Sequence, residues 1–537
     1  MPPAAIDNTP LPDDVVLLQA MIRELLATVH QQRQDLEGAQ ARLDQLLRRL
    51  YGPRAERFDP SQPLLFAPAE ATPPPPATPV EPVAPADRPT RTGHGRQRLP
   101  SQLPRRRVLH ELSEAERLCP CCGGLRQPLG QETSEQLDYQ PASLFVTEHV
   151  RVTYHCQACQ VRPSRVDLPA DTPTVSTFVT APKPPQPIER GLPGPGLLAH
   201  VIVSKYGDHL PLYRLERIFS RHGVQLSRST LCDWMASSAR LLAPLYEVMQ
   251  REVLLSKVIN TDDTPVPVLE PGRATTRQGS LWVYLGDTAH PYTLYDFTAS
   301  HTQEGPRVWL GDYRGYLQAD AYTGYDRLFA TGRIVEVACW AHARRKFYEG
   351  RETDPERAHY VLAQIRQLYA VEKQAQEQVD EQRLAEPGLW ELRRRLRQER
   401  SLPLVTSLGQ WLQQQQHLVL PKSPIGEAIT YALNQWPALL RYLDVGWLSI
   451  DNNAAERALR PVAVGRGNWL FAGSDQGGQT AAVLFSMTQT CARVGVDPFV
   501  YLRDVLSRLP CQAADGLEEL LPDRWAAAQR RAATAPP

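Results

Sequence analysis

The stretch Lys257-Val258-Ile259-Asn260-Thr261-Asp262 decides the fold of this 537-residue chain. It is an apolar, β-branched run that ends on a carboxylate, and this composition is typical of a strand. A second run, Gly315-Tyr316-Leu317-Gln318-Ala319-Asp320, ends in the same way. The periodicity predicts further elements, namely strands over 280–286, 291–297 and 334–339 and a helix over 303–311. The order βββαβαβ, with acids ending the first and fourth strands, is the RNase H-like plan, in which those two strands are neighbours.

A third acid, Glu456, lies in Asp451-Asn452-Asn453-Ala454-Ala455-Glu456-Arg457, which indicates the start of a helix. Divalent cations prefer oxygen ligands, and two of them can clamp the attacking and leaving oxygens of a phosphodiester. We therefore expect Asp262, Asp320 and Glu456 to be catalytic and to hold two Mg²⁺ ions, with Mn²⁺ as a substitute. The ordinary alternative for each acid is a solvated surface residue or a helix cap. Asp263 competes with Asp262, because adjacent strand residues point to opposite faces; we favour Asp262.

Asp320 and Glu456 are 136 positions apart, which is more than a bare core needs. Residues 351–440 are rich in Glu, Gln, Arg, Leu and Ala, a composition that favours helices. The sequence thus predicts an RNase H-like core with a helical insertion. The expected ranges are 257–350 and 446–510 for the core, 351–445 for the insertion and 511–537 for a C-terminal tail.

The helix that carries Glu456 has two predicted auxiliary residues, Asn452 and Arg460. Both share a face with Glu456, at i, i+4 and i+8. Arg460 is expected to steady the carboxylate or to hold a phosphate, and Pro461 to end or kink the helix.

The charge of the chain is balanced, with 59 basic and 59 acidic residues, so a nucleic-acid surface requires local segregation of charge. An Arg-rich stretch over 88–107 provides it, and Arg105, Arg106 and Arg107 are predicted to bind DNA. The N-terminus lacks the pattern of a secretory signal, and no apolar run approaches the roughly 18 residues of a membrane span. We expect a cytoplasmic bacterial protein associated with the nucleoid.

Residues 12–52 follow a heptad pattern that predicts a coiled coil and, through it, a homodimer or higher oligomer. The alternative is one amphipathic helix packed on its own protein. A Pro-rich and then Arg-rich linker, expected to be irregular, follows over 53–107. The apolar positions of the heptad are Val15, Ile22, Val29, Leu36, Leu43 and Leu50 on one seam, and Leu18, Leu25, Ala39 and Leu46 on the other.

Two cysteine pairs flank an alternating, strand-like stretch over 144–154. Such pairs are typical of a structural zinc site, so 108–172 is predicted to be a zinc-binding module. Redox or free buried cysteines are the alternative, and Cys121 or His155 could replace a neighbouring ligand. The predicted zinc ligands are Cys119, Cys122, Cys156 and Cys159.

Residues 190–256 contain three helical segments, over 196–206, over 212–222 before Gly223, and from a cap at Ser227 toward Leu255. This arrangement predicts a helix-turn-helix domain, with an ordinary helical bundle as the alternative. The recognition helix would present Arg228, Ser229 and Thr230 to DNA.

The stretch Cys339-Trp340-Ala341-His342 is followed by a basic segment. It could be half of a metal site, but no second half is close in sequence. We favour a buried pair with a basic helix beyond it that faces DNA through Arg344, Arg345 and Lys346.

Taken together, these residues resemble a transposase of the Insertion Sequence 66 family. The similarity includes the paired cysteines, Gly194-Pro195-Gly196, Asp262-Asp263-Thr264-Pro265, Cys339-Trp340-Ala341-His342 and Asp451-Asn452-Asn453-Ala454-Ala455-Glu456-Arg457. The resemblance implies a DDE transposase with Asp262, Asp320 and Glu456 as its triad, two Mg²⁺ ions, terminal-inverted-repeat DNA as substrate, and small accessory proteins of the same element. Two rival functions stay open. One is an RNase H-like nuclease that cuts without joining, and the other is an inactive, transposase-derived DNA-binding repressor.

Overall fold

The computed structural model describes residues 28, 99, 101, 103–119, 123–140, 143–156, 178–382 and 385–534. The predicted coiled coil over 12–52 lies outside the described residues except for Thr28, as does most of the linker. The chain divides into two units, residues 1–95 and 96–537, and all the named elements belong to the second. No described helix has both the length and the apolar character needed to cross a bilayer.

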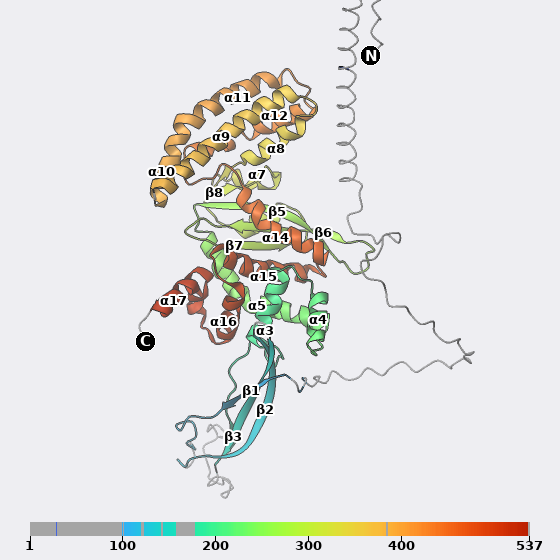
Figure 1. Cartoon of the computed structure of the whole chain (residues 1–537), viewed down its shortest axis with the longest axis vertical. Coiled ribbons are helices and arrows are strands. Elements are labelled where there is room, and N and C mark those ends of the chain that lie inside the picture. The colour runs from blue at the N-terminus through green and yellow to red at the C-terminus, as the bar shows by residue number, and fades with distance from the viewer. Residues whose placement is uncertain are drawn as a thin grey trace, which may run out of the picture. The chain divides into compact units, whose positions relative to one another are not determined.

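A five-stranded mixed sheet lies at the centre of the second unit (Figure 1). Its order is β7-β6-β5-β8-β9, antiparallel from β7 to β5 and parallel from β5 to β9. The predicted strands and the helix α6 are confirmed, and the first and fourth strands are neighbours. The bounds are β5 Val258–Val268, β6 Arg277–Leu285, β7 Thr293–Thr298, α6 Glu304–Leu310, β8 Gly315–Gln318 and β9 Ile334–Val337.

Strand β5 is longer than predicted, because it passes Asp262 and continues to Val268. The run of strand composition ended at Asp262, before Pro265 and Pro267. Pairing with β8 stops at Asn260, and from there on no described strand pairs with that side of β5. The carbonyl of Pro267 accepts the Ala472 N–H on the side away from β6. The missing N–H of Pro267 therefore removes no ladder hydrogen bond, as is usual for proline in strands.

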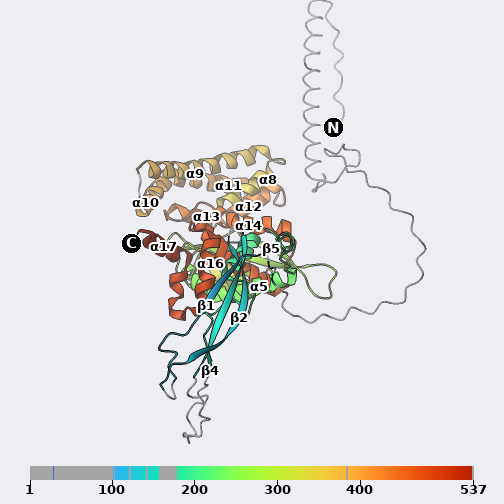
Figure 2. The ribbon, with the colours of Figure 1, turned by 60° about the horizontal axis from the view of Figure 1, so that its bottom comes forward.

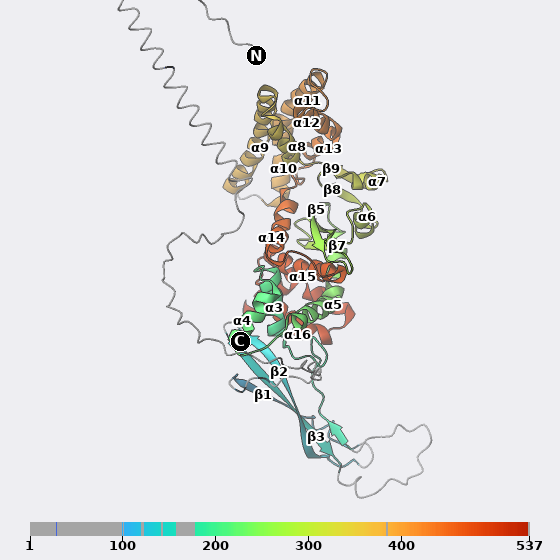
Figure 3. The same cartoon turned by 90° about the vertical axis from the view of Figure 1, so that its right-hand side faces the viewer.

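Helix α14 (Asn453–Trp469) packs on β5 and β6, and α15 (Asp475–Arg493) packs on β7 and on α5. In Figure 3, α14 lies on one side of the sheet and α6 on the other. Pro461 lies inside α14, so the expectation that it ends the helix was wrong, while the alternative of a kink stays a prediction.

The interval between β9 and α14 is helical, as predicted, and its apolar side chains form a second core that also includes Val258 of β5 and Val337 of β9. Val361, Leu408 and Ile429 belong to that core, which α9, α11 and α12 surround (Figure 1). The elements of this interval are α8 Trp340–Gly350, α9 Pro355–Gln382, α10 Glu386–Leu396, the π-helix η2 Arg397–Ser401, α11 Leu402–Gln416, α12 Pro424–Asn434, α13 Trp436–Leu440 and η3 Arg441–Leu443. Between β8 and β9 lie η1 Thr323–Tyr325 and α7 Asp326–Phe329.

A smaller sheet, ordered β1-β3-β2 with β4 beside β3, carries the two cysteine segments. Strand β1 begins inside the segment predicted to be an irregular linker, which corrects that prediction. It pairs in parallel with β3, so that Arg105 lies beside Val146. The bounds are β1 Arg105–His110, β2 Gln127–Gln140, β3 Ser143–His155 and β4 Phe178–Thr180.

Three helices follow, α3 Pro195–Tyr206, α4 Leu212–Arg221 and α5 Arg228–Val253, close to the predicted ranges. In Figure 2, strand β2 runs toward α16 (Pro498–Arg508). There Tyr139 of β2 contacts Phe499 of α16 edge to face.

The predicted C-terminal tail is wrong for the described residues up to 534. They form η4 Leu509–Cys511, η5 Ala514–Leu520 and α17 Pro522–Thr534. Leu520, Leu521 and Trp525 are buried in the main core, and the Trp525 indole donates to Asp504 at 2.8 Å. The apolar residues of this segment recur at helical spacing and pack against the main core, although the residues at its two ends are polar.

Candidate active site

Asp262, Asp320 and Glu456 come from three elements that meet at one edge of the sheet. Asp262 lies within β5, Asp320 two residues after β8, and Glu456 in the first turn of α14. Burial raises the pKa of Asp262 to about 7, and the nearby negative charges of Asp320, Asp263 and Glu456 act in the same direction. The three predicted acids therefore share one electrostatic environment.

A buried amide network fixes α14 against the sheet. The side chain of Asn452 is fully buried, donates to the Thr261 carbonyl at 2.8 Å, and accepts from Asn260 at 3.0 Å. Asn260 also donates to Gln318 at 3.1 Å, and Gln318 donates to the Ser449 carbonyl at 2.8 Å. A buried polar network makes the fold rigid and favours one arrangement of its elements when every donor and acceptor in it has a partner. Asn452 thus positions α14, and Glu456 lies one turn further along.

Cys339 strengthens this junction. Its buried thiol accepts the Asn452 N–H at 3.1 Å, so the first turns of α8 and α14 are joined. Burial raises the pKa of the Cys339 thiol to about 11, which keeps it protonated. In this structure the thiol thus serves as a hydrogen-bond acceptor between the two helices.

His342 lies in the site itself, a placement that was not predicted. Its Nε2 is 3.4 Å from Glu456 Oε1, while Arg345 Nη2 is 3.7 Å from Oε2. Burial lowers the pKa of His342, Glu456 and Asp320 oppose that shift, and Arg345 reinforces it. The signal was the three-residue spacing from Cys339, which places His342 in the first turn of α8.

Asp263 has partners of its own. Its Oδ1 accepts from His301 Nε2 at 3.1 Å, and the His301 ring stacks on Trp282. Asp263 lies opposite Trp282 across the β5–β6 ladder, whereas Asp262 lies opposite Val283. This arrangement favours Asp262 over Asp263 as the third acid beside Asp320 and Glu456.

The donor set fits hard divalent cations, because all three acids offer oxygen. Glu456 Oε1 is buried without a hydrogen-bond partner, and the clustered negative charge would be relieved by a cation. Across the described ranges, no three His, Cys, Asp or Glu side chains already surround a single metal position.

The remaining residues predicted near the site are exposed. Arg344, Arg345 and Lys346 lie on the open face of α8, and the Arg344 guanidinium lies 5.9 Å from the centre of the Tyr348 ring. Arg460 is exposed on α14. A DNA backbone that approached Glu456 would meet this basic face.

The predicted recognition helix α5 begins as expected. Ser227 Oγ accepts the Thr230 N–H at 3.2 Å and lies 2.8 Å from the Ser229 hydroxyl. Arg228 is exposed, and its backbone N–H donates to Glu216. Arg228 is thus accessible at the N-terminal end of α5, where the predicted DNA contact would lie.

The cysteine segments are only partly described. Cys119 and Cys156 are buried, and the turn after Cys119 is closed by the Gly123 N–H to the Cys119 carbonyl at 2.8 Å. Gly123 has a φ of +69°, which glycine adopts without strain. Cys122 and Cys159 lie outside the described residues.

The arginines of β1 are engaged within the small sheet. Arg105 pairs with Glu135 at 3.0 Å, Arg106 lies over the Phe145 ring, and Arg107 donates to Gln131 at 3.2 Å. Their contribution to DNA binding stays a prediction.

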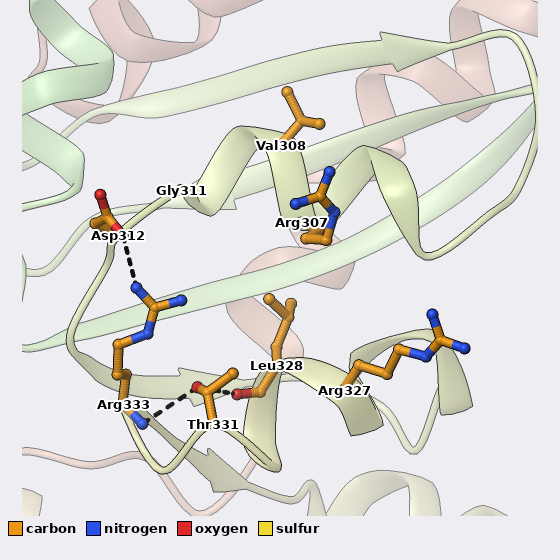
Figure 4. A pocket seen from close by; sticks show the side chains of 8 residues that line it. All are labelled: Arg307, Val308, Gly311, Asp312, Arg327, Leu328, Thr331 and Arg333. Carbon is orange, nitrogen blue, oxygen red and sulfur yellow. Dashed lines mark hydrogen bonds and ion pairs between the residues drawn. The ribbon is translucent and has the colours of Figure 1, made fainter.

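A cavity of about 460 Å³ lies away from the acids (Figure 4). Asp312 and Arg333, which pair at 2.6 Å, precede β8 and β9, whereas Asp320 follows β8. The cavity is lined by Arg307, Val308, Gly311, Asp312, Arg327, Leu328, Thr331 and Arg333.

Comparison with known families accounts for this arrangement of a cysteine-bearing sheet, a helical group and an acid-lined sheet edge. The model described as "Transposase IS66 family" matches residues 190–480, and that described as "zinc-finger binding domain of transposase IS66" matches 116–160. The "IS66 C-terminal element" matches 486–522, and "Transposase C of IS166 homeodomain" matches 39–108. The chain belongs to the IS66 family of transposases.

Relatives in Sinorhizobium fredii cover much of the chain. The uncharacterized protein y4jD is 32% identical over 97% of this chain and 98% of its own length. The uncharacterized protein y4hP is 33% identical over 81% of this chain and 78% of its own length. A third, y4qI, is 34% identical over 82% and 79%.

Proposed function

We propose that this chain is a DDE transposase with an RNase H-like core, which binds terminal inverted repeats and catalyses metal-dependent strand cleavage and strand transfer. The observation that carries the proposal is the meeting of Asp262, Asp320 and Glu456, where burial and the neighbouring acids raise the pKa of Asp262 to about 7. The sheet order β7-β6-β5-β8-β9, with acids on or just after its parallel central strands, supports the RNase H-like assignment.

Asp262, Asp320 and Glu456 would hold two Mg²⁺ ions, or Mn²⁺ in their place. When bound, such ions lower the barrier by stabilising the attacking and leaving oxygens of the phosphodiester. The protein's own part is to fix the acids through Asn452 and Cys339 and to keep the network behind them dry. The basic face of α8 (Arg344, Arg345 and Lys346) would hold the DNA backbone beside them.

The proposed chemistry consists of two phosphoryl transfers. In the first, a water oxygen bonds to phosphorus as the phosphorus–O3′ bond breaks, which frees a 3′-hydroxyl. In the second, that hydroxyl oxygen bonds to a target phosphorus as the target's phosphorus–O3′ bond breaks. Each nucleophile releases one proton and each leaving oxygen takes one up, so no covalent protein–DNA bond is needed.

The other modules would bind DNA and assemble the protein. Phosphate contacts from the zinc module, the helix-turn-helix and the basic segments would supply most of the affinity and its salt dependence. The zinc would be held by Cys119, Cys122, Cys156 and Cys159, and the coiled coil would pair protomers so that two ends react together.

A joining assay tests this function. Purified chain, a pre-cleaved transposon end, target DNA and Mg²⁺ should give joined products, and Asp320→Asn should abolish joining while DNA binding persists. Products that are cut but never joined would favour the nuclease, and binding without any reaction in the wild type would favour the repressor. Unchanged joining by Asp320→Asn would refute the catalytic assignment.

A further inference from the structure

Two side chains of α8 face the carboxylate of Glu456. His342 Nε2 lies 3.4 Å from Oε1, and Arg345 Nη2 lies 3.7 Å from Oε2. The Arg345 side chain is 58% exposed and lies at the rim, whereas that of His342 is only 19% exposed. His342 is therefore the inner neighbour of Glu456.

Glu456 and His342 each have one buried polar atom without a hydrogen-bond partner. These atoms are Glu456 Oε1 and His342 Nδ1. A buried polar atom without a partner costs about 1–3 kcal/mol, and native proteins contain few. Two of them on adjacent side chains, beside a cluster of acids, indicate a functional arrangement.

The backbone fixes the relative position of the ring and the carboxylate. Helix α8 begins directly after β9, and the Trp340 N–H donates to the Ile450 carbonyl at 3.2 Å, just before α14. The Cys339 thiol accepts the Asn452 N–H from the same segment. His342 and Glu456 are thus carried by two helices whose first turns are joined at two points.

We propose that His342 is a positioning residue for Glu456, an inference that rests on the proposed function. In this role the 3.4 Å contact between His342 Nε2 and Oε1 would close to a hydrogen bond, with Nε2–H as the donor, and would hold the carboxylate beside Asp262 and Asp320. His342 itself would not touch the reacting atoms. Carboxylates that bind metals are commonly held by a hydrogen bond of this kind, whose loss costs about 10–100-fold in metal affinity or activity.

The test measures Mn²⁺ binding to the full chain by electron paramagnetic resonance, without DNA or turnover. His342→Ala should weaken Mn²⁺ binding by about 10–100-fold. His342→Phe keeps a ring of similar size without the donor and should bind as weakly. His342→Gln, whose amide nitrogen can replace Nε2, should bind nearly as well as the wild type. His359→Ala, a change at an exposed residue of α9, is the matched control and should have no effect.

Two outcomes would overturn the positioning role. The first is wild-type Mn²⁺ affinity in both His342→Ala and His342→Phe, and the second is a His342→Gln variant as weak as His342→Ala. Thermal unfolding of each variant separates loss of the fold from loss of the contact. The Glu456→Gln variant separates failure of the positioning role of His342 from failure of the proposed function. If it loses Mn²⁺ while His342→Ala does not, only the positioning role fails; if it binds like the wild type, the proposed function itself fails.

Discussion

The helical segment between β9 and α14 and the acid-lined edge of the sheet both bury charged side chains, but these differ in how fully they are paired. Arg397 is 1% exposed and pairs with both oxygens of Glu372 at 2.7 Å. Its remaining donors reach the carbonyls of Tyr442, Val445 and Leu448. At the sheet edge, no basic side chain in the described part of the chain pairs with Asp262, and its neighbours are acids.

This is the difference expected between a charge that only stabilises the fold and charges that bind a ligand, as proposed for the three acids. A buried ion pair is tolerated when every donor and acceptor is satisfied. A cluster of acids without cations is costly by itself, because desolvation and like-charge repulsion add. Such a cluster persists where the surrounding structure enforces it, as Asn452 and Cys339 do here, and where a ligand relieves the cost.

The largest expected effect comes from breaking the paired region. Arg397→Leu leaves Glu372 buried without its partner and should destabilise the helical segment by about 3–5 kcal/mol. Native-state hydrogen exchange is the measurement, with amides of α9 and α11 losing protection. Amides of β6 and β7 provide the internal reference and should change little.

The double variant Arg397→Leu/Glu372→Leu removes both charges, so much of the lost protection should return. If the double variant is as unstable as Arg397→Leu, the carbonyl contacts of Arg397 carry the stability rather than the ion pair.

A smaller effect of opposite sign is expected at the unpaired region. The pKa of Asp262 is raised to about 7, so its contribution to stability is fully present below the unfolded pKa of about 3.9 and is lost as the pH rises through 7. Asp262→Asn removes this pH-dependent loss of stability, because the asparagine amide does not ionise. In metal-free buffer, its gain in unfolding free energy should grow from near zero at low pH to at most roughly 3–4 kcal/mol at pH 8.

Urea unfolding at several pH values checks this expectation, with Asp515→Asn, a change at an exposed residue, as the control. Added Mg²⁺ should stabilise the wild type more than Asp262→Asn, since a ligand that binds only the folded state shifts the equilibrium. A pH-independent difference between the two proteins would contradict the charge clustering.

The two regions also differ in how far the sequence predicts them. The runs ending at Asp262 and Asp320 have strand composition, so the central strands and the edge where the acids meet follow from local pattern. The partners of these elements come from distant positions: Arg397 meets Glu372 and three carbonyls of a later loop, and His342 meets Glu456 across 114 residues. Local pattern carries no information about such pairs.

The extension of β5 and the docking of α17 were missed for a related reason. Proline is rare in the middle of a strand, and Pro265 and Pro267 are accepted here because pairing with β8 stops at Asn260. Leu521 and Trp525 are core residues because they pack against distant elements, as Trp525 does against Tyr501 of α16. Composition alone does not reveal such contacts.

The smallest effect concerns a third kind of buried charge, which is held by backbone amides. Asp138 of β2 accepts the Leu197 N–H at 2.8 Å and so caps α3, whose own N-cap residue, Gly194, has no side chain to do so. A Cβ at Gly194 would lie 2.4 Å from the Asp138 carboxyl carbon, which explains the glycine there. Burial raises the pKa of Asp138, and the amide hydrogen bonds oppose that shift. The carboxylate is thus intermediate between the paired Glu372 and the unpaired Asp262.

Asp138→Ala should therefore cost about 1 kcal/mol, as the loss of a helix cap does. Hydrogen exchange in the first turn of α3 is the measurement, with β5 as the reference. Asp138→Asn keeps an acceptor oxygen for Leu197 and should lose clearly less. If both variants lose the same hydrogen-exchange protection in the first turn of α3, the negative charge of Asp138 rather than its hydrogen bond to Leu197 stabilises the helix. Asp138 would then have to be grouped with the paired acids of the helical segment.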